Sequence, residues 1–168
     1  MSETSVCRTS LSRFCVGNGV DIGYGGDSIT SSAITIDMAK PYNWVGKDPQ
    51  NLVGDCRDLY WFKDSVLDYV YSSHLLEDFL ELEIREILKE WFRVLRPYGL
   101  LILYCPVEKV YREHCKKTGQ IYNLAHKLEE FSLDFVKKVL DDTGLKYEIV
   151  HEVPLTGTYS FELVVRKL

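Results

Sequence analysis

Short apolar runs alternate along the chain with longer amphipathic segments. Five such runs, rich in β-branched residues, predict buried strands at residues 19–22, 33–37, 51–55, 67–72 and 100–105. From 77 to 95, apolar residues recur at steps of three and four, which predicts a long amphipathic helix with its charged residues on a solvated face. This alternation is typical of an α/β protein with a mostly parallel sheet and crossover helices on both faces.

The last third of the sequence predicts one more helix and a closing pair of strands. Ser132 stands where an N-cap residue is favoured, and Gly144 stands where a glycine commonly ends a helix. Strand-like runs at 146–150 and 160–165 flank Gly157, so we expect an antiparallel strand at the C-terminus.

Length, composition and charge narrow the class of protein. A chain of 168 residues with 46% hydrophobic and 27% charged residues fits one globular domain, which we place at 1–168. The net charge of −5 and the scattered basic residues disfavour nucleic acid as a partner. No apolar run approaches the roughly 20 residues of a membrane span, and no secretory signal is evident, so we expect a cytoplasmic protein.

The five cysteines are scattered and include no CxxC pair. This pattern fits neither a disulfide framework nor a zinc site, so we expect reduced thiols and no metal.

The residues that follow the first three predicted strands are suited to bind a ligand. Ligands of open parallel sheets bind beyond the carboxyl ends of the strands, and Gly23 and Gly25 there let a backbone approach closely. Asp37 and Asp55 end the next two strands, where a carboxylate can accept hydrogen bonds from a ribose diol. Ser28 stands where the dinucleotide fingerprint requires glycine, which argues against NAD.

Together these features resemble the class I S-adenosylmethionine-dependent methyltransferases, which have a Rossmann-like sheet. Residues 20–25 resemble the first motif of that family, 54–56 its adenine-binding motif and 67–74 its fourth motif. The segment 94–101, VLRPYGLL, resembles the approach to the fifth strand and is the most specific match. The amino-acid sequence of residues 71–78 is most similar to that of methyltransferases associated with sugar and polysaccharide biosynthesis.

The resemblance implies that S-adenosylmethionine is the cofactor. It implies binding by nine residues at the strand ends: Asp21, Gly23, Tyr24, Gly25, Asp37, Met38, Asp55, Cys56 and Ser72. Among them, Asp37 would bind the ribose, Met38 would lie beside the adenine, and Asp55 would accept from its exocyclic amine.

One residue is a candidate for catalysis and three for substrate contact. His74 follows the fourth strand, and an unperturbed pKa near 6.5 suits it as a base or orienting group; the alternative is that it packs against the sheet. His114, Tyr122 and His126 lie in 107–130, a connection long enough to cover an active site. The two histidines lack further ligands at a usable spacing, which argues against a metal.

Two departures from the family pattern shape the expected function. The interval between Gly25 and Asp37 leaves room for only about one helical turn, at 27–32, so the first helix is predicted to be shortened. Residues 1–17 form an N-terminal extension too short for the substrate cover of many relatives.

We therefore predict an S-adenosylmethionine-dependent transferase that methylates a small molecule or glycan at oxygen, with a homo-oligomer left open. The competing hypothesis is a cofactor-binding, non-catalytic, methyltransferase-like adaptor subunit. A nucleotide-sugar or NAD enzyme on the same sheet is a third hypothesis, which Ser28 opposes.

Overall fold

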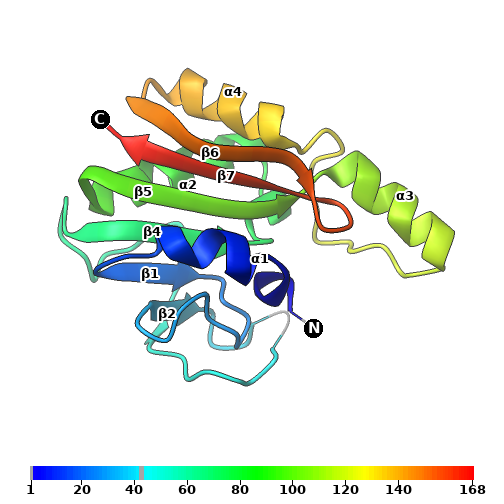
Figure 1. Cartoon of the computed structure of the whole chain (residues 1–168), viewed down its shortest axis with the longest axis horizontal. Coiled ribbons are helices and arrows are strands. Elements are labelled where there is room, and N and C mark those ends of the chain that lie inside the picture. Colours follow the sequence, from blue (N-terminus) through cyan, green and yellow to red (C-terminus); the bar gives the residue numbers. More distant parts are fainter. Residues whose placement is uncertain (1, 42–43) are drawn as a thin grey trace.

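A twisted sheet runs through the middle of the molecule, with helices on both faces (Figure 1). The computed structural model describes residues 2–41 and 44–168, and in these residues the sheet has seven strands, in the order β3-β2-β1-β4-β5-β7-β6. The strands are β1 (Gly19–Ile22), β2 (Ile34–Asp37), β3 (Leu52–Val53), β4 (Leu67–Ser73), β5 (Leu95–Pro106), β6 (Tyr147–Thr156) and β7 (Ser160–Lys167). The helices are α1 (Glu3–Leu11), α2 (Glu81–Val94), α3 (Glu108–Thr118) and α4 (Leu133–Thr143), with short 3-10 turns at Ser12–Phe14 and Leu76–Asp78.

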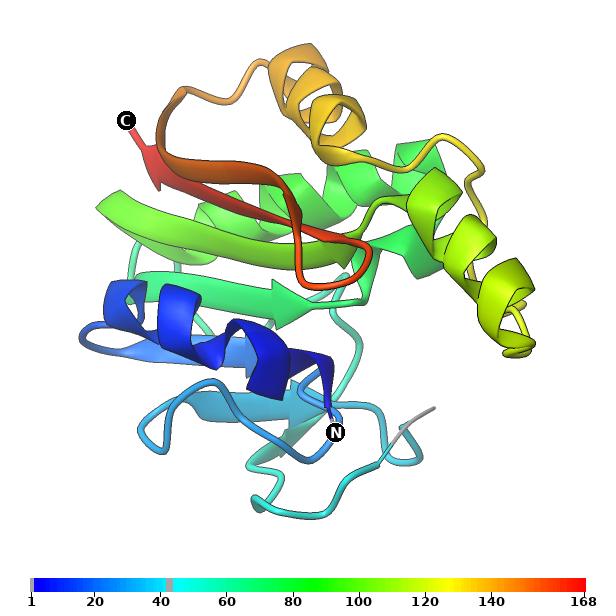
Figure 2. The same cartoon turned by 45° about the vertical axis from the view of Figure 1, so that its right-hand side comes forward.

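The strand directions confirm the predicted fold class. Strands β1 to β5 pair in parallel, and β7 is antiparallel to both β5 and β6. All four residues of β1 are buried, as expected for a central strand covered on both faces. The carboxyl ends of β1 to β4 therefore meet at one edge of the sheet, which Figure 2 shows beside α3 and the N-terminal end of α1.

On one face, α2 and α4 pack against the sheet. The apolar stripe of α2 buries Ile84, Ile87, Leu88 and Trp91 completely, because steps of three and four residues place them on one side of the helix. Helix α2 passes directly into β5, which begins at Leu95 rather than at the predicted residue 100.

The predicted ends of α4 are confirmed. The Ser132 hydroxyl accepts a hydrogen bond from the backbone N–H of Phe135 at 3.3 Å. Gly144 follows the helix with a φ of +73°, a conformation that glycine adopts without a steric penalty.

Helix α1 covers the other face of the sheet. The helical turn that was predicted at 27–32 is not formed. Residues 27–32 form turns and bends without a helical turn, and α1 of the N-terminal extension lies over β1, β4 and β5 (Figure 2). Its Cys7 and Leu11 are buried in a cluster with Tyr69, Tyr71 and Tyr104 of the sheet. The tyrosine-rich face of the sheet needs a cover, and α1 supplies it where the connection to β2 is too short.

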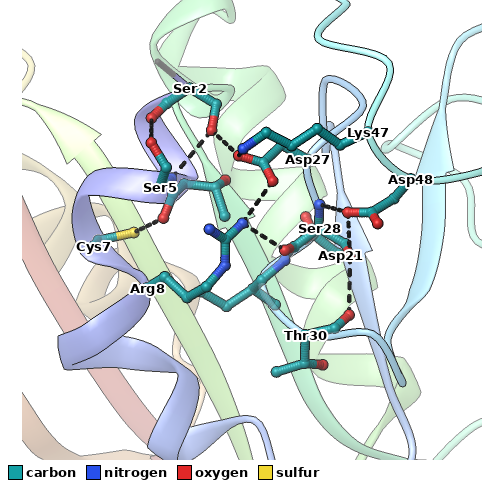
Figure 3. A network of polar contacts seen from close by, with 12 residues as sticks. Ser2, Ser5, Cys7, Arg8, Asp21, Asp27, Ser28, Thr30, Lys47 and Asp48 are labelled. Atoms are coloured by element: carbon teal, nitrogen blue, oxygen red, sulfur yellow. Dashed lines mark hydrogen bonds and ion pairs between the residues drawn. The ribbon is translucent and has the colours of Figure 1, made fainter.

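A polar network holds α1 against the turn that follows β1 (Figure 3). The buried Asp27 carboxylate accepts from Arg8 Nη2 at 2.7 Å, from Lys47 Nζ at 3.2 Å and from the Ser2 hydroxyl. Arg8 also donates to the Ser28 carbonyl oxygen at 2.9 Å. Burial alone would raise the pKa of Asp27, but hydrogen bonds from Ser2, Lys47 and Arg8 lower it. The network therefore fixes a charged carboxylate between the N-terminal segment and the turn.

The remaining sequence-based expectations concern cysteines and membranes. All five cysteines are free and buried. None of the helices in the described part of the chain is long and apolar enough to cross a membrane.

Candidate functional site

Three adjoining cavities lie at the carboxyl edge of the sheet. The strand-end cavity, of about 210 Å³, is lined by residues that end β1 to β3 and by Leu75, Asp78 and Phe79. The turn cavity, of about 350 Å³, lies between the glycine turn and residues 2–4 of the N-terminal segment. The aromatic cavity, also of about 350 Å³, is lined by residues such as His74, Glu77, Tyr111, Tyr122, His126 and Tyr159. Asp78 lines all three cavities, so they adjoin one another at this edge of the sheet.

The glycine turn after β1 gives the site its close backbone approach. Gly23 and Gly25 have φ angles of +69° and +58°, in the left-handed region that favours glycine. A Cβ atom at Gly23 would lie 2.9 Å from Leu75 Cδ2, so a side chain there would also intrude on the strand-end cavity. The turn therefore requires glycine for its backbone conformation and for space.

Asp37 connects the glycine turn with the end of β2. Its carboxylate accepts hydrogen bonds from the N–H of Gly25 at 3.1 Å and of Met38 at 2.8 Å. Burial raises the pKa of Asp37, although these two hydrogen bonds oppose the shift. Asp37 and Met38 line both the strand-end and the turn cavity, as do Gly23 and Leu75.

At the end of β3, Asp55 is held by an arginine two residues later. Arg57 Nη2 donates to Asp55 Oδ2 at 2.6 Å, and Arg57 Nε donates to Asp55 Oδ1 at 3.0 Å. These hydrogen bonds lower the pKa of Asp55, so the carboxylate is charged at neutral pH. Cys56 lines the same cavity, and burial raises the pKa of its thiol to about 12.

The structure does not bring two predicted cofactor residues into the cavities. Asp21 is buried beneath the turn, where it accepts from the Ile29 N–H at 2.7 Å, and burial raises its pKa to about 8. Ser72 lies within the sheet and donates to the Ile22 carbonyl oxygen at 2.9 Å. Their side chains stabilise the strand ends, whereas Tyr24 and Gly25 line the turn cavity as expected.

His74 lies between the turn cavity and the aromatic cavity and lines both. Its φ of +49° is unusual for a non-glycine residue, and its backbone N–H donates to the Tyr104 carbonyl oxygen at 2.8 Å. Its ring places Nε2 3.0 Å from Ser160 Oγ and Nδ1 3.5 Å from Glu77 Oε1. Burial, with a smaller contribution from His126, lowers the pKa of His74 to about 3, so the ring is neutral at neutral pH.

The predicted cover over 107–130 consists of α3 and a loop that is fixed to it. The buried Glu108 carboxylate binds the Tyr122 hydroxyl at 2.7 Å, His126 Nδ1 at 2.7 Å and Arg112 Nε at 2.8 Å. Burial would raise the pKa of Glu108, but these three partners lower it. Tyr122 and His126, two of the residues predicted to contact substrate, therefore line the aromatic cavity.

His114 does not line that cavity, in contrast to its predicted role. It lies on α3 with its ring centroid 5.3 Å from that of Tyr159, and it is Tyr159 that lines the cavity.

Sequence reasoning missed two parts of this site. Glu77 was expected on a solvated helix face, but its side chain is only 1% exposed and lines the aromatic cavity. Residues Ser2, Glu3 and Thr4 line the turn cavity, because α1 brings the N-terminal segment to the carboxyl edge of the sheet. The step of three from His74 to Glu77 was the one signal in the sequence that could have linked these two residues.

Comparisons with known proteins agree with this architecture. The family described as "Methyltransferase domain" matches residues 20–103, half of the chain. No curated protein matches the sequence.

Solved structures share the fold at low sequence identity. A protein from Pyrococcus horikoshii OT3 is 19% identical, with a TM-score of 0.72 over 98% of this chain and 89% of that one. A SAM-dependent methyltransferase from Archaeoglobus fulgidus is 15% identical, with a TM-score of 0.71 over 98% and 94%. Magnesium protoporphyrin IX methyltransferase from Synechocystis PCC 6803, solved with bound SAH, is 16% identical, with a TM-score of 0.60 over 90% and 74%.

Proposed function

Because the chain belongs to the methyltransferase domain family, we propose that it is a class I S-adenosylmethionine-dependent enzyme that methylates a small-molecule acceptor. The observation that carries this proposal is that neighbouring cavities share their walls. Asp37 and Met38 line both the strand-end and the turn cavity, and His74 lines both the turn and the aromatic cavity. A cofactor in the first two cavities would present its methyl group toward an acceptor in the third.

The residues of the strand-end and turn cavities fit this cofactor. Asp37 would accept hydrogen bonds from the ribose hydroxyls, and Asp55 would accept from the exocyclic amine of the adenine. Ile22, Ile36 and Phe79 supply apolar surface beside the expected purine. The glycine turn leaves room for the methionine part next to Tyr24.

The bound cofactor supplies an electrophilic methyl group on a positively charged sulfur. A hydroxyl acceptor would need a lone pair in line with the methyl carbon at about 3–3.5 Å, and its proton would be released to water as the carbon–oxygen bond forms and the carbon–sulfur bond breaks. Neutral His74 can accept a hydrogen bond from an acceptor hydroxyl and orient it. A pKa of about 3 makes the ring a weak base, so orientation is the larger part of its role.

The acceptor that we propose is a hydroxyl of a compact molecule or of one end of a glycan. The aromatic cavity of about 350 Å³ suits a group of that size. The similarity of residues 71–78 to methyltransferases of sugar and polysaccharide biosynthesis supports the glycan. The chain acts in this proposal as a single domain, with residues 107–130 covering the acceptor.

The adaptor hypothesis loses its main support. It was based on a shortened first helix and a missing N-terminal cover, but α1 covers the sheet and residues 2–4 line the turn cavity.

Calorimetric titration with S-adenosylmethionine and with its demethylated product, S-adenosylhomocysteine, tests the cofactor site. We expect binding of both, and a loss of about 10- to 100-fold in affinity for Asp37→Asn, because a charge-assisted hydrogen bond is removed. Glu86→Gln, an exchange at a side chain that is 72% exposed on α2, is the matched control. If the wild-type protein binds neither compound, the proposal that it is an S-adenosylmethionine-dependent enzyme is refuted.

Turnover is then measured as S-adenosylhomocysteine released with a panel of hydroxylated small molecules and sugars. Cofactor binding without turnover for any acceptor would favour the adaptor instead.

A further inference from the structure

Glu77 is an unexplained carboxyl in the aromatic cavity. Its side chain is 1% exposed, and neither of its oxygens has a hydrogen-bond partner. The basic groups within 4 Å of its Oε1 are His74 Nδ1 at 3.5 Å and His126 Nε2 at 3.9 Å, and neither makes a hydrogen bond to it. A buried polar group without a partner is costly, and such groups are rare unless they serve a ligand or another function.

The charges around this carboxyl favour a cation. Glu3 and Asp78 also line the aromatic cavity, and Asp78 Oδ1 is likewise buried without a partner. Neither lysine nor arginine is found among the described residues that line it. A carboxylate or phosphate on the acceptor would therefore meet repulsion without a compensating partner.

The tyrosines of the cavity offer ring surface rather than hydroxyl groups. The Tyr122 hydroxyl donates to Glu108 at 2.7 Å, and the Tyr159 hydroxyl donates to Glu3 at 2.8 Å. The Tyr111 hydroxyl accepts from the Asn123 N–H at 3.1 Å. With their hydroxyls bound to the protein, these rings can contact a ligand through apolar and π surface, which attracts ammonium groups.

We propose that the acceptor carries a compact cationic group, a protonated amine or a quaternary ammonium, which pairs with Glu77 against the tyrosine rings. The inference rests on the proposed function and names the class of its acceptor. An amino sugar or amino alcohol meets the requirements of the proposed function and of this inference, because it has a hydroxyl for methylation and an amine that pairs with Glu77. A protonated amine supplies the hydrogen-bond donors that both oxygens of Glu77 lack, whereas a quaternary ammonium supplies only the opposite charge.

Binding of the cationic ligand would change the protonation state of Glu77. Burial raises the pKa of Glu77 well above its usual value, so the empty cavity favours the neutral carboxyl. Glu77 faces His74, which follows β4, and Cys105 of β5. It also faces His126 of the loop, Glu108 of α3 and Glu3 of α1, together with its neighbour Asp78. A bound cation favours the charged carboxylate, and one proton then leaves Glu77 as the ligand binds.

Two probes of the same shape test the proposal. Choline and 3,3-dimethylbutan-1-ol differ by the charge on one atom, and each is titrated calorimetrically into protein saturated with S-adenosylhomocysteine. We expect choline to bind about 10- to 100-fold more tightly, the range for an interaction with a charged group. Glu77→Gln keeps the size of the side chain and should bring the two affinities close together. Glu86→Gln, at the exposed acid of α2, should leave the preference unchanged.

The outcomes separate this inference from the proposed function. If S-adenosylhomocysteine does not bind, the proposed function itself is refuted. If it binds but the two probes bind equally, or choline does not bind at millimolar concentration, only the cationic acceptor is refuted. Should Glu77→Gln fold poorly, the wild-type preference decides the question, and glucosamine against glucose provides a second charged and neutral pair.

Discussion

Acidification from pH 7 to pH 5 should destabilise the protein through His74. The pKa of this imidazole is about 3 in the folded protein and about 6.5 in an unfolded chain. The unfolded chain therefore binds a proton that the folded protein excludes, so stability is present above pH 6.5 and is lost as the pH falls toward 3. Integrated between pH 7 and pH 5, this linkage lowers the free energy of unfolding by about 2 kcal/mol.

The contribution of His74 is isolated by comparison with His74→Asn. Asparagine does not titrate, and it tolerates the left-handed backbone that His74 adopts at a φ of +49°. Urea unfolding at pH 7 and pH 5 gives the free energy of each protein at each pH. We expect the wild-type protein to lose about 2 kcal/mol more than the variant.

Two buried carboxyls should raise the free energy of unfolding as the pH falls, which opposes the effect of His74. The wild-type protein and the His74→Asn variant both retain these carboxyls. The pKa values of Asp21 and Glu77 are raised by burial, so their stabilising effect grows as the pH falls. The difference between wild type and variant is therefore the quantity to compare. Equal losses in both proteins would contradict the argument. An NMR titration that places the pKa of His74 above 6 would show that the neighbouring carboxylates outweigh burial.

Three further predictions concern the turn and its supports. Gly23→Ala should weaken S-adenosylhomocysteine binding at least about 10-fold by calorimetry, because the new Cβ atom meets Leu75 and the left-handed backbone is strained; an unchanged affinity would show that the turn lies away from the cofactor. Asp37→Asn should lower cofactor affinity while the melting temperature changes by only a few degrees, and a collapse of the melting temperature would assign Asp37 a structural role instead. Arg8→Met should lower the free energy of unfolding by about 1–2 kcal/mol in urea, since the buried Asp27 loses one partner, and no loss would show that Lys47 and Ser2 suffice.

Much of the sheet could be predicted from the sequence because its signals are local. Buried strands appear as apolar runs, and the residues after them are recognisable as glycines and acids without any knowledge of the fold. Asp37 and Gly25 were therefore placed correctly at one edge, where they form a hydrogen bond. The third strand was predicted too long: β3 includes only Leu52 and Val53, since an edge strand needs few pairing residues.

The missed features depend on contacts between distant segments. The sequence of α1 is rich in serine and threonine, and its buried positions Cys7 and Leu11 form a pattern too weak to predict a cover for the sheet. Glu77 adjoins a charged helix, so its charge suggested solvent. It is buried because the loop returns over it, where the Lys127 N–H donates to the Glu77 carbonyl oxygen at 2.9 Å. Hydrophobic periodicity describes only neighbouring residues, so it could not predict a contact between segments this far apart in the sequence.

The position of α1 has a consequence for how the chain folds. The Tyr159 hydroxyl donates to Glu3, and Ser10 donates to Glu162 of β7, so α1 completes its contacts with a hairpin that is synthesised after all the other strands of the sheet. Contacts so far apart in sequence form slowly because a long loop must close. Until the hairpin of β6 and β7 emerges, Leu11 and the tyrosine-bearing face of the sheet lack their full cover. During synthesis this face is the surface on which a nascent chain would depend most on chaperones.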